Sequence, residues 1–267
     1  MTTTDGQVQG SAELGDPLEL GQARTFGSLF TGIGGMDLGL ERAGWTARWQ
    51  VENHPDRVPV LERHWPDITR YGDVTTIDWS TVERVELVAG GFPCQDISSG
   101  GRKIGITGAR SGLWKAMVAA IRDLRPRYVL VENVADLAVR GLDVVLGDLA
   151  LLGFDAEWST LSACALGAPH PRRRLFVVAQ RPGDDEPGQG AHDALSDRRQ
   201  EDWAWQPRGG GSHRRGGLRW LPEPSLDRVA HGVPHRVVGP QLSGLGNTVV
   251  PDLAEWIGTR LIERTAA

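Results

Sequence analysis

The stretch TFGSLFTGIGG, residues 25–35, decides the fold class of this chain. Residues Thr25–Phe30 predict a strand, and the glycine turn Thr31–Gly35 follows it directly. A helix is expected next, near Met36–Ala43. Glycines in such a turn let the backbone approach a ligand at the carboxyl end of a strand. The stretch therefore predicts the opening of a parallel α/β sheet with a ligand site at its rim.

The same alternation of apolar runs and amphipathic helical stretches continues along the chain. Further strands are expected near Trp49–Val51, at Val85–Ala89 and at Tyr128–Val131, and helices at Leu113–Leu124, capped by Ser111, and from Pro251 onward. One face of the last helix carries Val250, Ala254, Ile257 and Leu261. We predict an α/β fold: a mostly parallel, doubly wound (Rossmann-like) sheet with helices on both faces, plus a small irregular lobe.

Composition divides the chain into three parts. Residues 1–23 carry four acids and no Lys or Arg, which predicts a disordered acidic arm. Residues 24–180 and 243–265 show the alternation of apolar runs and amphipathic helical stretches, and we expect them to form the main domain. Between them, residues 181–242 are rich in Gly, Pro, Asp, Arg and Trp and show little periodicity, so we expect a separate short lobe or loop system there.

Charge and cysteine content narrow the classes of protein. The net charge of −5 disfavours a nucleic-acid binder, but the acidic arm accounts for most of it, and arginines cluster after Trp205 and in Arg172–Arg174. Only two cysteines, Cys94 and Cys164, are present, so neither a disulfide framework nor a zinc spacing is indicated. Without a long apolar run or a signal sequence, we expect a soluble, cytoplasmic protein without a metal.

Polar residues follow several of the predicted strands. Asp37 stands where a dinucleotide fingerprint would have its third glycine, which weakens a pyrophosphate-binding reading of the glycine turn. Glu52 lies 20 residues after Gly32, at the end of the next strand, where an acid can accept hydrogen bonds from ribose hydroxyls. Asp73 could accept from an adenine amino group, although a solvated loop residue explains it equally well. The set suggests a cofactor that contains a nucleoside.

A thiol and a carboxylate are predicted to share the same edge of the sheet. Cys94 follows a strand and two glycines, and a polar, Gly-rich stretch comes after it, which favours an exposed nucleophile under a closing loop over a small core residue. Glu132, in Glu132–Val134, ends another strand. Because carboxyl ends of parallel strands meet at one edge, we expect the two side chains to lie close together.

At this point the chain resembles a known family, the C5-cytosine DNA methyltransferases. The resemblance covers roughly residues 24–180 and 242–261. It rests on five motifs in the family's order: Phe30–Gly35, Pro93–Gln95, Glu132–Val134, Arg172–Arg174 and Gly246–Val249. Pro-Cys with a later Glu-Asn-Val is the most specific part.

The resemblance implies a reaction and assigns roles in it. Cys94 would attack C6 of a cytosine flipped out of duplex DNA, and Glu132, protonated or sharing a proton with N3, would stabilise the charge that develops. Arg174, with Arg172 as second candidate, resembles the family's Arg-x-Arg pair near the base and the thiol. A base or water then removes the C5 proton and Cys94 leaves.

The resemblance also implies binding residues. The cofactor would be S-adenosyl-L-methionine, held by Phe30, Gly32, Ile33, Gly34, Gly35, Glu52, Asn53, Asp73, Val74, Pro93, Leu113, Asn247 and Val249. Double-stranded DNA would be contacted by Gln95, Ser98, Arg208, Arg214 and Arg215. A restriction endonuclease is a companion that the family allows, in a bacterial or phage-infected cell.

Two departures and one short region stand out. His170 occupies a position where the family commonly has Gln, and Ile97 or Asn53 a position where it has an aromatic residue. Cys164 matches no catalytic position and is interpreted as structural. Residues 181–242 are short for the family's target-recognition region. Their tryptophans are expected to form a small core, and Arg208, Arg214, Arg215 and Arg219 a phosphate-contacting face or, failing that, a loop.

Two other functions remain open from the sequence, and a third fails. A tRNA C5 methyltransferase would share every catalytic residue. A partner-dependent DNA-binding homologue is compatible with the short recognition region, but the presence of Cys94, Glu132 and the arginine pair argues against it. A nicotinamide-dependent oxidoreductase lacks the third glycine and leaves the later motifs unexplained.

Overall fold

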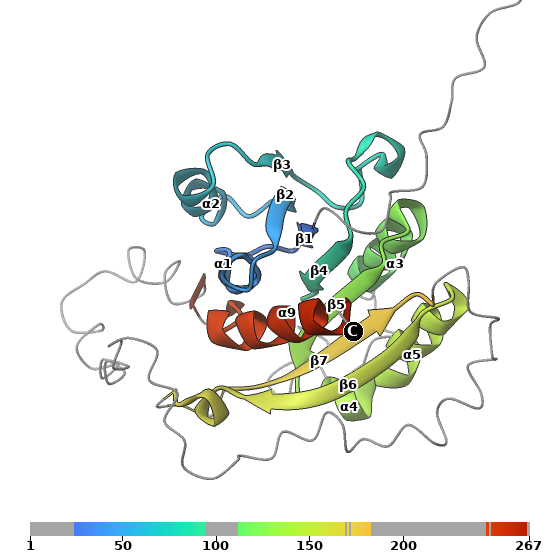
Figure 1. The fold of residues 1–267 in the computed structure, drawn as a ribbon. Helices are drawn as coiled ribbons and strands as arrows, with labels where there is room; N and C mark the ends of the chain where they lie inside the picture. Colours follow the sequence, from blue (N-terminus) through green and yellow to red (C-terminus); the bar gives the residue numbers. More distant parts are fainter. Residues whose placement is uncertain are drawn as a thin grey trace, which may run out of the picture.

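The structure is a computed structural model that describes residues 24–93, 112–182 apart from 169 and 171, and 244–265 apart from 246. Within these residues seven strands form one sheet in the order β3-β2-β1-β4-β5-β7-β6 (Figure 1). The strands are β1 (Thr25–Leu29), β2 (Thr46–Val51), β3 (Thr69–Tyr71), β4 (Leu87–Gly91), β5 (Tyr128–Val134), β6 (Asp155–Ser162) and β7 (Arg173–Gln180).

Strand direction confirms the predicted fold class. The pairs that join β3, β2, β1, β4 and β5 are parallel, whereas β7 runs antiparallel to both β5 and β6. The strand order reverses between β1 and β4, which is where ligands bind in open α/β sheets. The sheet is therefore the mostly parallel, doubly wound sheet that the sequence predicts.

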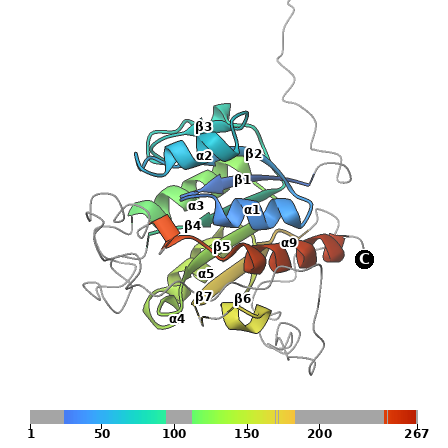
Figure 2. The same cartoon turned by 90° about the vertical axis from the view of Figure 1, so that its left-hand side faces the viewer.

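Helices cover both faces of the sheet. On one face, α1 (Gly35–Arg42) lies beside α9 (Pro251–Thr265), as Figures 1 and 2 both show. On the other face lie α3 (Gly112–Leu124), α4 (Leu137–Arg140) and α5 (Leu142–Leu151). The remaining short elements are α2 (Val58–His64) and the 3-10 turns η1 (Trp79–Thr81) and η3 (Ala163–Leu166).

The two apolar cores follow from side-chain alternation along the strands. In β5, Tyr128 and Leu130 belong to the core under α1 and α9, and Val129 and Val131 to the core under α3 and α5. Successive residues of a strand point to opposite faces, so a strand covered by helices on both sides must be apolar throughout. This is why Tyr128–Val131 reads as a continuous apolar run.

The predicted element boundaries agree in part. β1 ends one residue before Phe30, β4 lies two residues later than predicted, and β5 continues to Val134. The predicted face of α9 is buried as expected. α2, α4, α5, β6 and β7 were not predicted from the sequence. Ser111, the arm 1–23 and all but the first two residues of the region 181–242 lie outside the described residues.

The described residues hold neither a membrane-spanning helix nor a metal-binding cluster of side chains. No helix among them has the length and apolar character that crossing a membrane requires. The same residues contain no cluster of three or more His, Cys, Asp or Glu side chains suited to a metal ion.

Candidate active site

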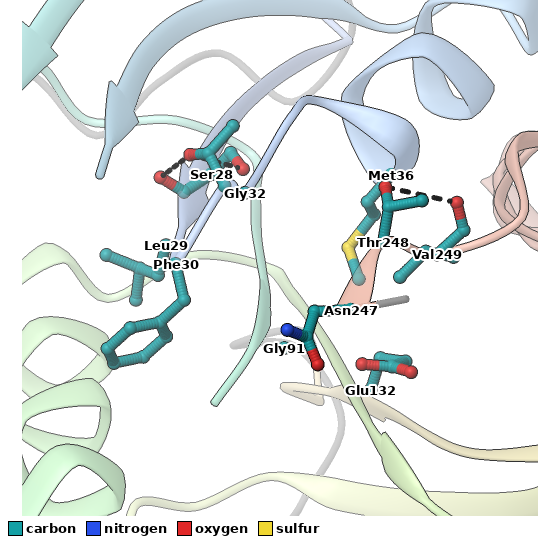
Figure 3. A pocket seen from close by; sticks show the side chains of 11 residues that line it. Ser28, Leu29, Phe30, Gly32, Met36, Gly91, Glu132, Asn247, Thr248 and Val249 are labelled. Carbon is teal, nitrogen blue, oxygen red and sulfur yellow. Dashed lines mark hydrogen bonds between the residues drawn. The ribbon is translucent and has the colours of Figure 1, made fainter. Parts of the chain in front are cut away.

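A pocket that opens to solvent lies at the carboxyl ends of β1, β4 and β5 (Figure 3). Its place beside the reversal between β1 and β4 is the one expected of a ligand site in this fold. It is lined by Ser28, Leu29, Phe30, Thr31, Gly32, Met36, Gly91, Glu132, Asn247, Thr248 and Val249. Segments 25–36, 91, 132 and 247–249, far apart in sequence, thus meet at one rim.

The glycine turn forms one wall of the pocket. Its backbone turns sharply, because Phe30, Gly32 and Gly34 have positive φ values of 55°, 65° and 84°. A non-glycine residue at positive φ stores strain of about 1–3 kcal/mol, a feature that concentrates at ligand sites. At Gly35 an added Cβ would lie 2.2 Å from Thr248 Oγ1. Because Gly35 has no side chain, the segment before α9 can pack against the turn and form part of the pocket wall.

Glu52 is buried against this turn. It follows β2, and its carboxylate accepts hydrogen bonds from the Gly32 amide (2.7 Å) and the His54 amide (2.9 Å). The Arg57 guanidinium lies 3.5 Å from the same carboxylate. The acid predicted from its distance to Gly32 in sequence is therefore joined to Gly32 directly. Arg57 was not foreseen, because no sequence pattern connects it to Glu52.

The other predicted cofactor residues are placed unevenly. Asp73 follows β3 and is exposed; its side chain accepts from the Thr75 amide (2.9 Å) and hydroxyl (2.8 Å), which lowers the pKa of Asp73. It does not line the pocket. Val74 is buried, Ile33 and Leu113 are half-buried, and Asn53 and Pro93 are exposed. Of the predicted set, Phe30, Gly32, Asn247 and Val249 line the pocket.

Glu132 lines the pocket near the end of β5, close to the end of the adjacent strand β4. An added Cβ on Gly91 would come within 2.6 Å of its Oε2, so glycine at the end of β4 makes room for this carboxyl. Arg174 reaches it from the antiparallel strand β7, where it pairs with Val134, and its Nε lies 3.0 Å from Glu132 Oε1. The antiparallel direction of β7 thus brings the predicted arginine to the predicted acid.

Burial sets the protonation of Glu132. Removal from water raises the pKa of Glu132 from 4.5 to about 7, although Arg174 and then Arg172 act in the opposite direction. Burial therefore outweighs two nearby guanidinium groups. At neutral pH the carboxyl is present in both its charged and its neutral form, as a proton donor to a bound substrate requires.

Arg172 ties the segment before α9 to this rim. Its guanidinium donates a hydrogen bond to the Thr248 carbonyl, and burial is the main cause of a lowered Arg172 pKa. Asn247, next to Thr248, lines the pocket on the same side as Glu132 in Figure 3. The two predicted arginines therefore do different things: Arg174 pairs with the acid, and Arg172 positions backbone.

Asn133 is a site residue to which the sequence analysis assigned no role. Its side-chain amide donates to the Phe92 carbonyl (3.0 Å), and its oxygen accepts from the Val134 amide (2.8 Å). Phe92 is buried and packs against Trp114 in a tilted arrangement, with ring centroids 5.3 Å apart and an interplanar angle of 46°. Asn133 thus anchors the segment that leads to Cys94. An amide directly after Glu132 at a strand end was the available signal.

Several predicted residues cannot be placed. Cys94, Gln95, Ser98, Arg208, Arg214 and Arg215 lie outside the described residues. His170 is half-buried. Cys164, interpreted from the sequence as structural, has an exposed side chain, with its sulfur 3.1 Å from Ser162 Oγ.

Comparison with known proteins identifies a family. A family model described as C-5 cytosine-specific DNA methylase matches residues 24–204. The chain is 35% identical over 160 residues to the Type II methyltransferase M2.BsuMI of Bacillus subtilis, a match that covers 57% of this chain and 41% of that protein. It is 34% identical over 160 residues to the Escherichia coli Type II methyltransferase M.Eco47II, covering 57% and 38%. The chain thus matches about two fifths of the length of these relatives.

Solved structures share the fold. A Spodoptera frugiperda DNMT2 mutant aligns with a TM-score of 0.51 at 19% identity, over 62% of this chain and 52% of that one. The Entamoeba histolytica methyltransferase EhMeth aligns with a TM-score of 0.53 at 16% identity, over 62% and 56%. At such identities the likeness concerns the fold alone.

Proposed function

Because the chain belongs to the C-5 cytosine-specific DNA methylase family, we propose that it transfers a methyl group from S-adenosyl-L-methionine to carbon 5 of cytosine in duplex DNA. The observation that carries this proposal furthest is the Glu132 carboxyl, buried at the pocket rim beside Arg174 and able to hold a proton near neutral pH.

The pocket residues fit the cofactor. Glu52, which adjoins the pocket through its hydrogen bond from the Gly32 amide, can accept hydrogen bonds from ribose hydroxyls at the strand end where such acids act, and Phe30, Thr31 and Gly32 of the strained turn line the pocket. Asn247 and Val249 would close the site from the α9 side. When bound, S-adenosylmethionine supplies an electrophilic methyl group on a positively charged sulfur.

Cys94 would start the reaction. Its thiolate forms a bond to C6 of the flipped cytosine, the C5–C6 double bond opens, and the electron pair is delocalised toward N3, which makes C5 nucleophilic. C5 would take the methyl group as the bond from that methyl to the sulfonium sulfur breaks, which leaves a neutral thioether. A base or water then removes the C5 proton, the double bond re-forms and the thiolate leaves. Arg172 and Arg174 would favour the thiolate form by their positive charge.

Glu132 would stabilise the charge on the ring. In its neutral form it donates a proton toward N3 as the sulfur–carbon bond forms, and it takes the proton back when Cys94 leaves. The ion pair with Arg174 holds the Glu132 carboxyl in position, and the positive charge of Arg174 limits how far burial raises the pKa of Glu132. Asn133, through Phe92, would fix the start of the segment that carries Cys94.

The substrate and its surroundings follow from the same chemistry. Gln95, Ser98, Arg208, Arg214 and Arg215 are the proposed DNA contacts, with sequence choice in residues 181–242. The Bacillus subtilis and Escherichia coli relatives are Type II methyltransferases, so a companion restriction endonuclease in a bacterial or phage-infected cytoplasm fits the proposal. No step in it needs a metal.

The test measures transfer of a radiolabelled methyl group to DNA and to tRNA in parallel. The proposal expects label in DNA, at C5 of cytosine after digestion, and none with Cys94→Ala, which should still bind the cofactor. Bisulfite sequencing of DNA from expressing cells would then give the target. Label in tRNA alone would make the chain an RNA methyltransferase, and label in neither would contradict the enzyme assignment.

A further inference from the structure

A second carboxyl group, Asp37, is completely buried beneath the pocket wall and takes no part in the reaction proposed above. It belongs to the first turn of α1 and is 0% exposed. Ser28 Oγ of β1 donates to its Oδ1 at 2.7 Å, and Gln50 Nε2 of β2 donates to its Oδ2 at 2.8 Å. One side chain thus joins the helix that follows the glycine turn to both strands beside it.

Hydrogen bonds extend from Asp37 to the pocket. Ser28 Oγ lies 3.0 Å from Thr31 Oγ1, and both residues line the pocket. Because Ser28 has one hydroxyl proton and gives it to the charged carboxylate, its oxygen can only accept from Thr31. The charged form of Asp37 therefore fixes the direction of both hydroxyls.

The charges around Asp37 are few. Glu41 follows it on α1, and Arg70 of β3 reaches it only through Gln50, whose Oε1 accepts from the guanidinium at 3.0 and 3.2 Å. α9 meets α1 at Gly39 through uncharged atoms of Pro251, Ala254 and the next backbone amide. Burial raises the pKa of Asp37 to about 6, against the opposing effect of the Ser28 and Gln50 hydrogen bonds.

We infer that Asp37 is a positioning residue for cofactor binding: its charged form, acting through Ser28 and Thr31, holds the wall of the pocket in the arrangement that takes S-adenosylmethionine. This inference rests on the proposed function. Protonation reverses the chain of hydrogen bonds, because a neutral Asp37 must donate to Ser28, which then donates to Thr31. The Thr31 proton is left with only the Ser28 and Val51 carbonyls, both at 3.3 Å.

The test is the dissociation constant of S-adenosylmethionine, measured by calorimetry on the full chain at pH 8 and pH 5.5. With a pKa of about 6, roughly one quarter of Asp37 is charged at pH 5.5, so the apparent Kd should rise about 4-fold from its value at pH 8. Asp37→Asn keeps the shape of the side chain and places a neutral, donating group there. This variant should bind S-adenosylmethionine at least about 4-fold more weakly than wild type at pH 8, and its Kd should not rise further at pH 5.5.

Two more variants complete the experiment. Ser28→Ala leaves Asp37 in place but removes its link to Thr31, so it should lose most of the pH effect even if Asp37→Asn fails to fold. Asp148→Asn is the matched control, since Asp148 also accepts from a side chain, Trp114 Nε1 at 2.7 Å, but on the opposite face of the sheet. It should behave as wild type. Glu132, which titrates near pH 7 in the same pocket, contributes alike to all four proteins.

The outcomes separate the two ideas. Weaker binding by Asp37→Asn together with a flattened pH profile in Ser28→Ala supports the inference. A folded Asp37→Asn that binds as wild type at both pH values overturns it, as does a folded Ser28→Ala that keeps the full rise. Wild-type protein that fails to bind S-adenosylmethionine at pH 8 overturns the proposed function itself.

Discussion

At the scale of single residues, the site depends on two carboxyl groups whose surroundings differ. Glu132 is buried and faces guanidinium groups, whereas Glu52 is buried and faces backbone amides and Arg57. The first arrangement suits a group that exchanges a proton, and the second suits a hydrogen-bond acceptor that amides and a guanidinium hold in place. The sequence predicted both acids from their positions at strand ends, but not the partners that give them different chemistry.

Glu132→Gln should slow methyl transfer by about 100-fold or more, because the amide cannot give a proton to N3 and take it back. In the wild type, the folded-state pKa of about 7 lies above the ordinary 4.5, so the neutral, donating form is lost as pH rises through 7. Single-turnover rates should therefore fall above pH 7. A rate that stays level to pH 9 would contradict the role of Glu132 as donor.

Glu52→Ala should weaken S-adenosylmethionine binding by about 1–3 kcal/mol, because ribose hydrogen bonds and the anchor of the Gly32 amide are both lost. Calorimetry is the measurement. Glu62→Ala, which removes an exposed acid on α2, is the matched control and should leave affinity unchanged. Equal affinity in both variants would remove Glu52 from the site.

At the scale of elements, the pocket requires close approach of α1 and α9. Gly35 and Gly39 on α1 face Thr248, Val249 and Pro251, which come more than 200 residues later in the sequence. The glycine turn could be predicted because strand, turn and helix are local patterns. The contact between α1 and α9 could not be predicted, because no local pattern in either segment indicates which helix it packs against. β6 was not predicted because most of its residues are only half-buried and its apolar and polar residues alternate weakly.

Gly39→Ala should destabilise the protein by about 1–3 kcal/mol, since its Cβ would lie 2.2 Å from the Pro251 carbonyl oxygen and 2.6 Å from Ala254 Cβ. Urea unfolding measures the change. Gly147→Ala, in α5, is the control: no atom lies within 4 Å of its added Cβ, so it should stabilise by up to about 1 kcal/mol. Equal midpoints for the two variants would show that α1 and α9 do not pack as described.

At the scale of the whole molecule, the catalytic rim and the choice of DNA sequence are expected to lie in different parts of the chain. The rim is assembled from segments on both sides of residues 181–242. Because the chemistry is the same for every target, specificity should come from an interchangeable part, and this region is the one without sheet-and-helix texture. Its structure could not be predicted, because composition without periodicity carries little information about packing.

We expect at least one of Arg208, Arg214, Arg215 and Arg219 to read a base. A guanidinium that binds guanine O6 and N7 discriminates by about 1–3 kcal/mol, so its change to alanine should relax preference at one target position. A phosphate-contacting arginine should instead weaken all sequences alike and flatten the salt dependence. Methylation profiles over a randomised-site library separate the two. Four variants with wild-type preference and rate would place recognition elsewhere.

The central claim is that Cys94 attacks cytosine so that C5 can take a methyl group. The most direct measurement is mass spectrometry of the protein after incubation with S-adenosylmethionine and duplex DNA in which 5-fluorocytosine replaces the target cytosine. Fluorine cannot leave as a proton does, so the sulfur–C6 bond should persist as a covalent adduct, carrying the transferred methyl group and mapping to Cys94. Normal methylation of ordinary DNA without any adduct on the fluorinated duplex would contradict the claim.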